Sequence, residues 1–246
     1  MDLKLNKKNI LITGANGYLG KALVKELKSH KSNLILIDNK NQKKKVSKRT
    51  NFLFCDLNQK KSIDRLIKSL KKIKIDGIVN CAAITSDELK DFNQLNSHSS
   101  DFDKVININL KSIIYIIHSL NKNFKNGASI INIGSIYGYL APNMKIYKNT
   151  KIFNSLSYSL SKAALNQFTR WFSSRFAPKF RANTISPGGI LRKQEKKFIS
   201  NYKSLTPLNR MGKEKDIVPL ILFLLSDKSS YITGQNIIVD GGFSII

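Results

Sequence analysis

Short apolar stretches alternate with longer amphipathic stretches along most of the chain. Continuous apolar runs that end in glycine or aspartate are typical of strands buried on both faces of a sheet. The longer stretches have apolar residues at helical spacing. The predicted strands are Asn9–Thr13, Leu34–Ile37, Asn51–Cys55, Gly77–Cys81, Ala128–Gly134, Arg181–Ser186 and Asn236–Val239. The predicted helices are Tyr18–Lys31, Ser62–Ile73, Phe102–Leu120, Leu156–Phe176 and Asp216–Leu225.

This alternation predicts an α/β fold in which a parallel sheet carries helices on both faces. No internal repeat, low-complexity tract or linker interrupts the pattern, so a single domain over residues 1–246 is expected. Residues 40–49 are predicted to be a polar, basic loop, and residues 190–211 a long irregular stretch.

Composition agrees with a folded chain in a reducing compartment. The sequence is 41% hydrophobic, enough for a sizeable core. Its 2 cysteines, Cys55 and Cys81, form neither a disulfide framework nor a metal-ligand set, so buried free thiols and no metal are expected. No signal-peptide pattern opens the sequence, and the apolar run Ile217–Leu225 is too short to span a bilayer. We therefore expect a soluble, cytoplasmic protein without a membrane partner.

The net charge of +26 has two interpretations. A strongly basic chain suits a polyanionic partner or an anionic substrate. Alternatively, Lys, Ile and Asn are abundant together because all three have A/T-rich codons. We favour the second reading and expect no nucleic-acid partner, because lysine outnumbers arginine and specific phosphate or base recognition favours the arginine fork.

Three glycines, Gly14, Gly17 and Gly20, lie between a predicted strand and a predicted helix. This pattern lets a pyrophosphate approach backbone N–H groups at the start of a helix, where a Cβ would block it. Asp38 ends the next strand. A carboxylate there can accept the ribose hydroxyls of NAD and would repel the 2′-phosphate of NADP, so NAD is expected rather than NADP.

A tyrosine and a lysine four residues apart on a helix share one face, where the ammonium would lower the phenol pKa for acid–base work. The spacing occurs twice, as Tyr147 with Lys151 and as Tyr158 with Lys162. We favour Tyr158, because it lies near the start of a long amphipathic helix, whereas the helical context of Tyr147 is weak.

With these motifs the chain resembles the short-chain dehydrogenase/reductase family over nearly its whole length, which implies a doubly wound Rossmann fold. The matching elements are the Gly14–Gly20 turn, Asp56, Asn80-Cys81-Ala82-Ala83, Asn109, the Gly134–Gly138 segment, Tyr158 with Lys162, Pro187-Gly188, Thr233-Gly234-Gln235 and Val239-Asp240-Gly241-Gly242. The resemblance implies hydride transfer with a nicotinamide cofactor. It assigns proton transfer to Tyr158, ribose binding and pKa control to Lys162, and substrate orientation to Ser135. Asn109 would hold a water that relays protons.

The resemblance also implies contact residues. Cofactor contacts fall on Thr13, Gly14, Asn16, Gly17, Tyr18, Leu19, Gly20, Asp38, Asp56, Leu57, Asn80, Ala82, Ala83, Tyr158, Lys162, Pro187, Gly188 and Ile190. Substrate contacts fall on Ser135, Tyr137, Tyr147, Tyr158 and Gly189, with substrate loops near residues 137–154 and 190–211. A homotetramer, or at least a homodimer, is expected, since the helices Phe102–Leu120 and Leu156–Phe176 carry more apolar residues than one buried face needs.

Three features depart from the family's compact branch. The glycine spacing and the 23-position gap from Ser135 to Tyr158 are similar to the extended branch, which acts on nucleotide sugars. Arg192 stands where the compact branch usually has a threonine that holds the carboxamide, and the backbone of Ile190 would make that contact instead. The chain in this respect resembles oxidoreductases of bacterial surface-sugar and flagellin-modification pathways.

These features favour an NAD(H)-dependent oxidoreductase of a sugar-like alcohol or ketone, a small-molecule substrate. One alternative is a 3-oxoacyl carrier-protein reductase or another general carbonyl reductase, for which the basic surface would suit an acidic carrier protein. The other is a cofactor-sensing or nucleic-acid-binding protein on the same fold. Family members in that role tend to lose the tyrosine or the lysine, and this chain retains both.

Overall fold

The computed structural model describes residues 2–40, 47–85 and 99–246. Its seven strands form one parallel sheet in the order β3-β2-β1-β4-β5-β6-β7, which confirms the predicted doubly wound α/β fold. Part of the predicted basic loop lies outside the described residues. The strands are β1 Asn9–Thr13, β2 Asn33–Asp38, β3 Thr50–Phe54, β4 Ile75–Asn80, β5 Phe124–Ile133, β6 Phe180–Pro187 and β7 Asn236–Val239.

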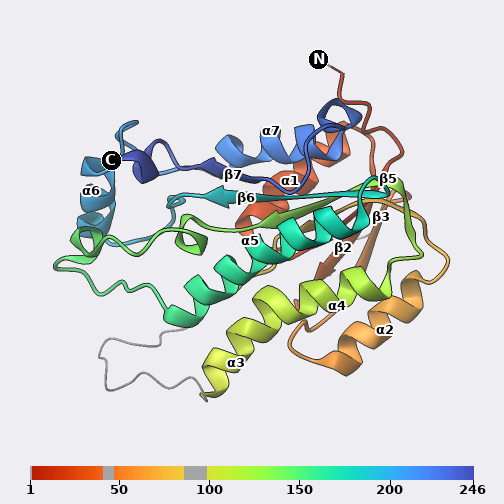
Figure 1. Cartoon of the computed structure of the whole chain (residues 1–246), viewed down its shortest axis with the longest axis horizontal. Coiled ribbons are helices and arrows are strands. Elements are labelled where there is room, and N and C mark those ends of the chain that lie inside the picture. The colour runs from red at the N-terminus through yellow and green to blue at the C-terminus, as the bar shows by residue number, and fades with distance from the viewer. Residues whose placement is uncertain (1, 41–46, 86–98) are drawn as a thin grey trace.

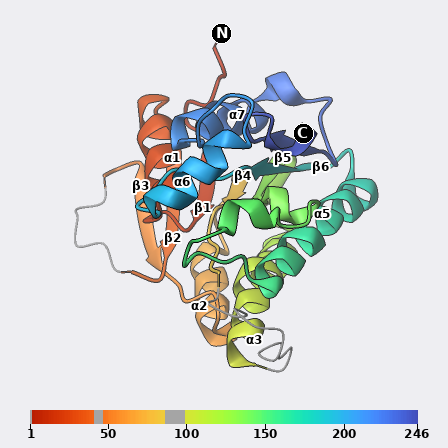
Figure 2. The same cartoon turned by 90° about the vertical axis from the view of Figure 1, so that its left-hand side faces the viewer.

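Helices cover both faces of the sheet (Figures 1 and 2). On one face, α1 and α7 bury apolar side chains against the central strands. On the other, α2, α4 and α5 enclose a second apolar core that includes the aromatic pair Phe124 and Phe180. The helices are α1 Tyr18–Ser29, α2 Lys60–Leu70, α3 Ser100–Ile106, α4 Ser112–Ser119, α5 Leu156–Phe176, α6 Lys196–Ser204 and α7 Glu214–Leu225.

Two predicted elements need correction. Residues 190–211 are not irregular throughout, because they contain α6, which buries Phe198 and Tyr202 one helical turn apart. The predicted helix Phe102–Leu120 is interrupted by a π-helical turn over Asn107–Lys111, which joins α3 to α4. Such turns shift the side chains that follow them and occur often at functional sites.

A third apolar cluster lies beyond the carboxyl ends of the strands (Figure 1). It joins the segment between β5 and α5, helix α6 and the C-terminal residues. Its buried members are Ile136, Ile146, Tyr147, Phe198, Tyr202, Met211 and Phe243. The rings of Tyr202 and Phe243 stack with centroids 4.7 Å apart. The two segments expected to line a substrate site are therefore packed against each other at the same end of the sheet.

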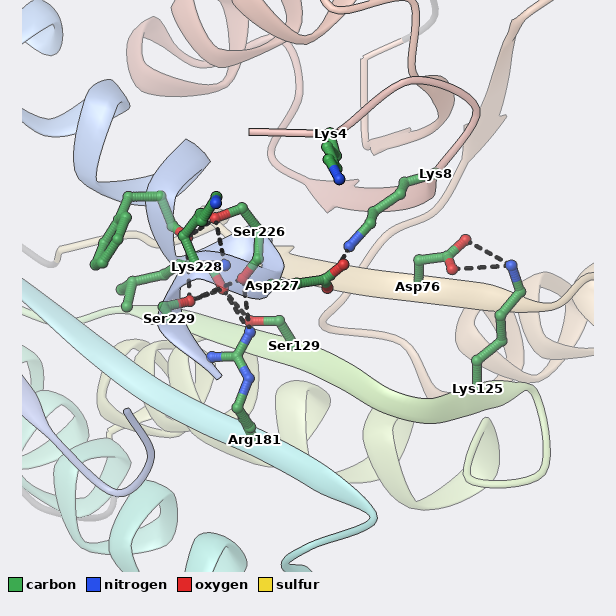
Figure 3. Close-up of polar contacts among 12 residues, drawn as sticks. Lys4, Lys8, Asp76, Lys125, Ser129, Arg181, Ser226, Asp227, Lys228 and Ser229 are labelled. Carbon is green, nitrogen blue, oxygen red and sulfur yellow. Dashed lines mark hydrogen bonds and ion pairs between the residues drawn. The ribbon is translucent and has the colours of Figure 1, made fainter. Parts of the chain in front are cut away.

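The opposite end of the sheet is fixed by a buried arginine. Arg181, in β6, is only 9% exposed and donates to the carbonyl oxygens of Leu224, Ser226 and Ile232 (Figure 3). Two of these carbonyls lie at the carboxyl end of α7, where the helix dipole favours a cation. Next to this end, Lys8 pairs with Asp227 at 2.7 Å (Figure 3). The arginine thus ties α7 to the sheet.

Both cysteines are free thiols. In the part of the chain that the structure describes, no group of histidine, cysteine and acidic residues is arranged to hold a metal ion. Among the same residues, no helix has the length and hydrophobicity to cross a membrane.

Candidate active site

The glycine turn follows β1 and leads into α1, as predicted. Gly14 has a φ of 68°, and a Cβ there would lie 2.7 Å from the backbone nitrogen of Ala82. A Cβ on Gly20 would lie 2.2 Å from the carbonyl oxygen of Gly14. Larger residues would therefore push the turn away from the end of β4 and separate α1 from the turn. Thr13 also binds this junction, since its hydroxyl accepts from the N–H of Ala82.

Asp38 lies at the carboxyl end of β2, beside the turn. Its carboxylate accepts the backbone N–H of Asn16 at 2.9 Å and that of Lys40 at 3.1 Å. The Asn16 side chain donates in return to the carbonyl of Lys40. Asp38 thus orients the glycine turn as well as offering a carboxylate at the site where a ribose was expected.

A cavity of about 360 Å³ opens at the carboxyl ends of β1, β2 and β4. It brings together many of the predicted cofactor contacts, namely Gly14, Asn16, Gly17, Asp38, Asp56, Leu57, Ala82 and Ala83, and adds Ile37, Asn39, Lys40, Cys55, Cys81, Ile84 and Ile108. Its polar groups converge on a flat, partly apolar recess, which fits the adenosine half of a dinucleotide. Tyr18 and Leu19, although predicted contacts, are not part of its lining.

Tyr158 lies in the first turn of α5, whose N-terminus is capped by the hydroxyl of Ser155. Its phenol is hydrogen-bonded to the side chain of Ser135, which follows β5. Burial raises the pKa of Tyr158 above its ordinary value, and the bond to Ser135 opposes this only in part. The sequence prediction that Lys162 holds this pKa low is therefore wrong for this state of the molecule.

Lys162 is fully buried on the next turn of α5. Its ammonium donates to the carbonyl oxygen of Ile133 at 2.7 Å and lies 5.5 Å from the centre of the Tyr158 ring. Burial lowers the pKa of Lys162 to about 8. The carbonyl of Ile133 was missed by sequence reasoning, because a backbone acceptor leaves no mark in the residue pattern.

Asn109 lies in the π-helical turn and is completely buried. Its side-chain oxygen accepts from the N–H of Ile84, and its amide donates to the carbonyl of Ile84 and to the hydroxyl of Ser161. That hydroxyl donates to the carbonyl of Tyr158. Asn109 therefore connects the segment after β4 to the turn of α5 that carries Tyr158 and Lys162. The contributions of Ile84 and Ser161 were not predicted.

Tyr147 and Lys151 do not form a second helical pair. Tyr147 ends a short 3-10 turn, Met144–Tyr147, and Lys151 is exposed. The hydroxyl of Tyr147 is hydrogen-bonded to that of Tyr137. Burial raises the pKa values of both phenols, that of Tyr147 to about 12, and proximity to Tyr158 contributes to both increases. The phenols of Tyr137, Tyr147 and Tyr158 are therefore close together.

The turn after β6 places Pro187, Gly188 and Gly189 beside the third apolar cluster. A Cβ on Gly188 would lie 2.7 Å from the hydroxyl of Tyr202, and the N–H of Gly189 donates to that hydroxyl at 2.6 Å. Ile190 continues the turn through a bridge to Gly212. The turn is thus held from α6, a support that the sequence did not reveal.

A chain of buried polar side chains crosses the sheet beneath the site. Asn80 in β4 donates to Asn132 in β5, which donates to Thr169 in α5, and Thr169 is hydrogen-bonded to Thr184 in β6. The side-chain oxygen of Asn80 has no partner in the described part of the chain. Asn80, which was predicted as a cofactor contact, is buried and is not among the residues that line the cavity.

Known proteins share this architecture over the whole chain. A family model described as enoyl-(acyl carrier protein) reductase matches residues 14–244. Post-translational flagellin modification protein A of Campylobacter coli is 32% identical, with 98% of this chain and 100% of the relative covered. A 3-oxoacyl-(acyl-carrier-protein) reductase FabG of Buchnera aphidicola is 34% identical, with 98% of each covered. A crystal structure of a short chain dehydrogenase from Leptospira borgpetersenii with bound NAD+ is 33% identical and superimposes with a TM-score of 0.86, covering 98% of this chain and 94% of that one.

The family model spans most of the chain, and the similar proteins are oxidoreductases or share their fold. The expected enzyme class is confirmed: the chain is an oxidoreductase that belongs to the short-chain dehydrogenase/reductase family.

Proposed function

We propose that the protein is an NAD(H)-dependent oxidoreductase that interconverts a sugar-like alcohol and the corresponding ketone. The observation that carries this proposal is the cluster of Ser135, Tyr158 and Lys162 next to a cavity that fits the adenosine half of a dinucleotide. A bound nicotinamide cofactor would supply or accept the hydride at the substrate carbon. The chain's own residues supply the proton and orient the substrate.

Tyr158 is the proton donor and acceptor in this proposal. Because burial keeps its phenol protonated near neutral pH, it is ready to donate a proton to a carbonyl oxygen during reduction. Ser135, whose side chain is next to the phenol, orients the same oxygen. Lys162 brings a positive charge beside the phenol, and Asn109 holds the turn of α5 that carries both groups.

Asp38 supports NAD rather than NADP as the cofactor. Its carboxylate lies in the cavity lining at the end of β2, where it can accept ribose hydroxyls and repel a 2′-phosphate. The bound NAD+ of the Leptospira relative agrees with this choice. Lys40 lines the same cavity, and its ammonium would favour a phosphate.

The Tyr137–Tyr147 phenol pair supports a hydroxylated substrate. Tyr158 contributes to the raised pKa values of both phenols, so their hydroxyls lie close to it and offer donors and acceptors near the reacting oxygen. The apolar side chains of the same segment are buried in the third cluster. The similarity to a flagellin modification protein agrees with this substrate class. A 3-oxoacyl carrier-protein reductase is the second candidate, favoured by the Buchnera relative and by the net charge of +26.

A matched pair of variants tests the assignment. Tyr158→Phe removes only the proposed proton donor, so we expect at least a roughly 100-fold loss of kcat and little change in NADH affinity. Tyr147→Phe removes a phenol of similar burial, and we expect it to change KM more than kcat. Activity of the wild type and both variants on keto-sugars and on an acetoacetyl thioester, each with NADH and NADPH, separates a sugar oxidoreductase from a 3-oxoacyl carrier-protein reductase. Faster thioester reduction with NADPH would reject the sugar proposal.

We also propose that copies of the chain associate into a dimer or tetramer through α4 and α5. Trp171 of α5 is 57% exposed and packs edge-to-face on Phe176. Leu160 of α5 and Ile114 of α4 are also exposed. Large exposed apolar side chains on long helices favour an interface. The free thiols Cys55 and Cys81 agree with a reducing, cytoplasmic location.

A further inference from the structure

Arg192, in the segment after β6, lies directly over the first residue of α1. Its guanidinium carbon is 4.3 Å from the centre of the Tyr18 ring. Its Nη1 lies 2.7 Å from a carboxylate oxygen of Glu214, the first residue of α7, and donates to the carbonyl of Leu191 at 2.7 Å. One side chain therefore joins the glycine turn, the loop after β6 and the start of α7.

The position of Arg192 is fixed by its backbone. The N–H of Leu191 donates to the carbonyl of Gly212 at 2.9 Å, and the N–H of Arg192 donates to the side chain of Gln194. The ion pair with Glu214 and the hydrogen bond to the carbonyl of Leu191 both use Nη1. Within residues 2–40, 47–85 and 99–246, neither Nε nor Nη2 has an acceptor. The planar fork thus keeps donors available for a further anion.

The start of α1 has the matching property. Gly17 is its N-cap and has no side chain to accept the first N–H groups, and no acidic residue lies in the first turn. The start of the helix therefore presents N–H groups that no side chain caps, together with the positive end of its dipole. Tyr18 is the first residue of α1, so the guanidinium that stacks on it lies close to this end, although Glu214 offsets part of its charge.

We propose that the Arg192 guanidinium binds the diphosphate of the cofactor and holds it against the N-terminus of α1. This inference rests on the proposed use of NAD(H). The neutral threonine that the sequence comparison expected at this position would contribute no charge, whereas Arg192 adds a charge-assisted bond to a doubly anionic group. Tyr18 orients the fork by stacking, and Glu214 restrains it. Cofactor affinity in this chain consequently gains an ionic component that depends on one residue.

The test compares Arg192→Met with Lys193→Met, which removes the same charge from an exposed neighbour. Isothermal titration with NADH, ADP-ribose and adenosine gives the dissociation constants. Hydrogen bonds to charged groups are stronger than those between neutral groups. We therefore expect Arg192→Met to weaken the binding of NADH and of ADP-ribose by about 10- to 100-fold and to leave the binding of adenosine unchanged. The dissociation constants of Arg192→Lys should lie between those of the wild type and of Arg192→Met. Those of Lys193→Met should stay within about twofold of the wild type. The wild-type affinity should also decrease more steeply with salt than that of Arg192→Met.

Other outcomes overturn the inference. If Arg192→Met lost equal affinity for adenosine and for ADP-ribose, Arg192 would only shape the loop. If Arg192→Met and Lys193→Met lost equal affinity for ADP-ribose, the effect would be one of overall charge. The ADP-ribose comparison does not depend on the choice of nicotinamide cofactor. If the wild type bound NADPH but not NADH, the proposed function would need revision while the ADP-ribose result still decided the role of Arg192. If the wild type bound no diphosphate ligand, both proposals would fall.

Discussion

Replacement of Lys162 by methionine should change the pH dependence of stability in a defined direction. The ammonium is fully buried, with the carbonyl of Ile133 as its hydrogen-bond acceptor. Burial lowers the pKa of Lys162 from its ordinary value of 10.5 to about 8. Between these two values the unfolded chain holds a proton that the folded chain has released. The unfolding free energy of the wild type therefore rises with pH through this window, and the methionine variant lacks the effect.

The size of the effect follows from the pKa difference. We compare the unfolding free energy of the wild type with that of Lys162→Met. From pH 7 to pH 9 this difference should rise in favour of the wild type by about 1.4 kcal/mol, and from pH 7 to pH 10 by about 2.5 kcal/mol. The variant leaves the carbonyl of Ile133 without its donor, but that cost does not change with pH. The raised pKa values of Tyr137, Tyr147 and Tyr158 affect both proteins and cancel in the difference.

Urea unfolding of both proteins from pH 7 to pH 10, at one protomer concentration, measures the difference directly. Lys162→Leu is a useful second variant, because it should give the same curve if the loss of the lysine is responsible. A difference that stays flat, or that decreases as pH rises, would refute the argument that burial destabilises the charged form of Lys162.

Three further predictions concern other parts of the molecule. Asp38→Ser keeps an acceptor for the glycine turn but removes the charge, so the ratio of kcat/KM for NADH over NADPH should fall at least about tenfold; an unchanged ratio would contradict the role of Asp38. Arg181→Leu should lower the unfolding free energy by about 2 kcal/mol in urea titrations, because buried carbonyls lose a charged donor, whereas Arg170→Leu on the exposed side of α5 should change it little. Trp171→Glu should reduce the assembly seen by light scattering after size exclusion; a wild-type peak at the 27.8 kDa chain mass would reject the oligomer itself.

Periodicity predicted most of the fold because the apolar runs of this chain are buried on both faces of the sheet. It failed at α6, where Phe198 and Tyr202 are the only buried residues in a nine-residue, lysine-rich helix. Two apolar residues at one helical interval are too weak a pattern to separate a short helix from a loop.

The spacing of Tyr158 and Lys162, together with their helical context, pointed to the proposed reacting groups, but it did not predict their electrostatics. The expected low pKa of Tyr158 assumed that a nearby ammonium dominates, whereas burial determines the direction in the structure. Likewise, the stacking of Arg192 on Tyr18 joins residues that are 174 positions apart, and only the fold brings them together.

The chain of polar side chains beneath the site limits how these positions can change. Asn80, Asn132 and Thr169 are linked by consecutive side-chain hydrogen bonds, so an apolar replacement at one of these three leaves a buried group of a neighbour without a partner. The effects of substitutions at these polar positions on the unfolding free energy should therefore be strongly non-additive. A substitution that destabilises the protein by itself should be tolerated only together with a second one. Over evolutionary time such positions are expected to be retained or exchanged as a block, because each single step passes through a less stable intermediate. The strands and the helix α5 beneath the proposed catalytic groups would then vary more slowly than their distance from the substrate suggests.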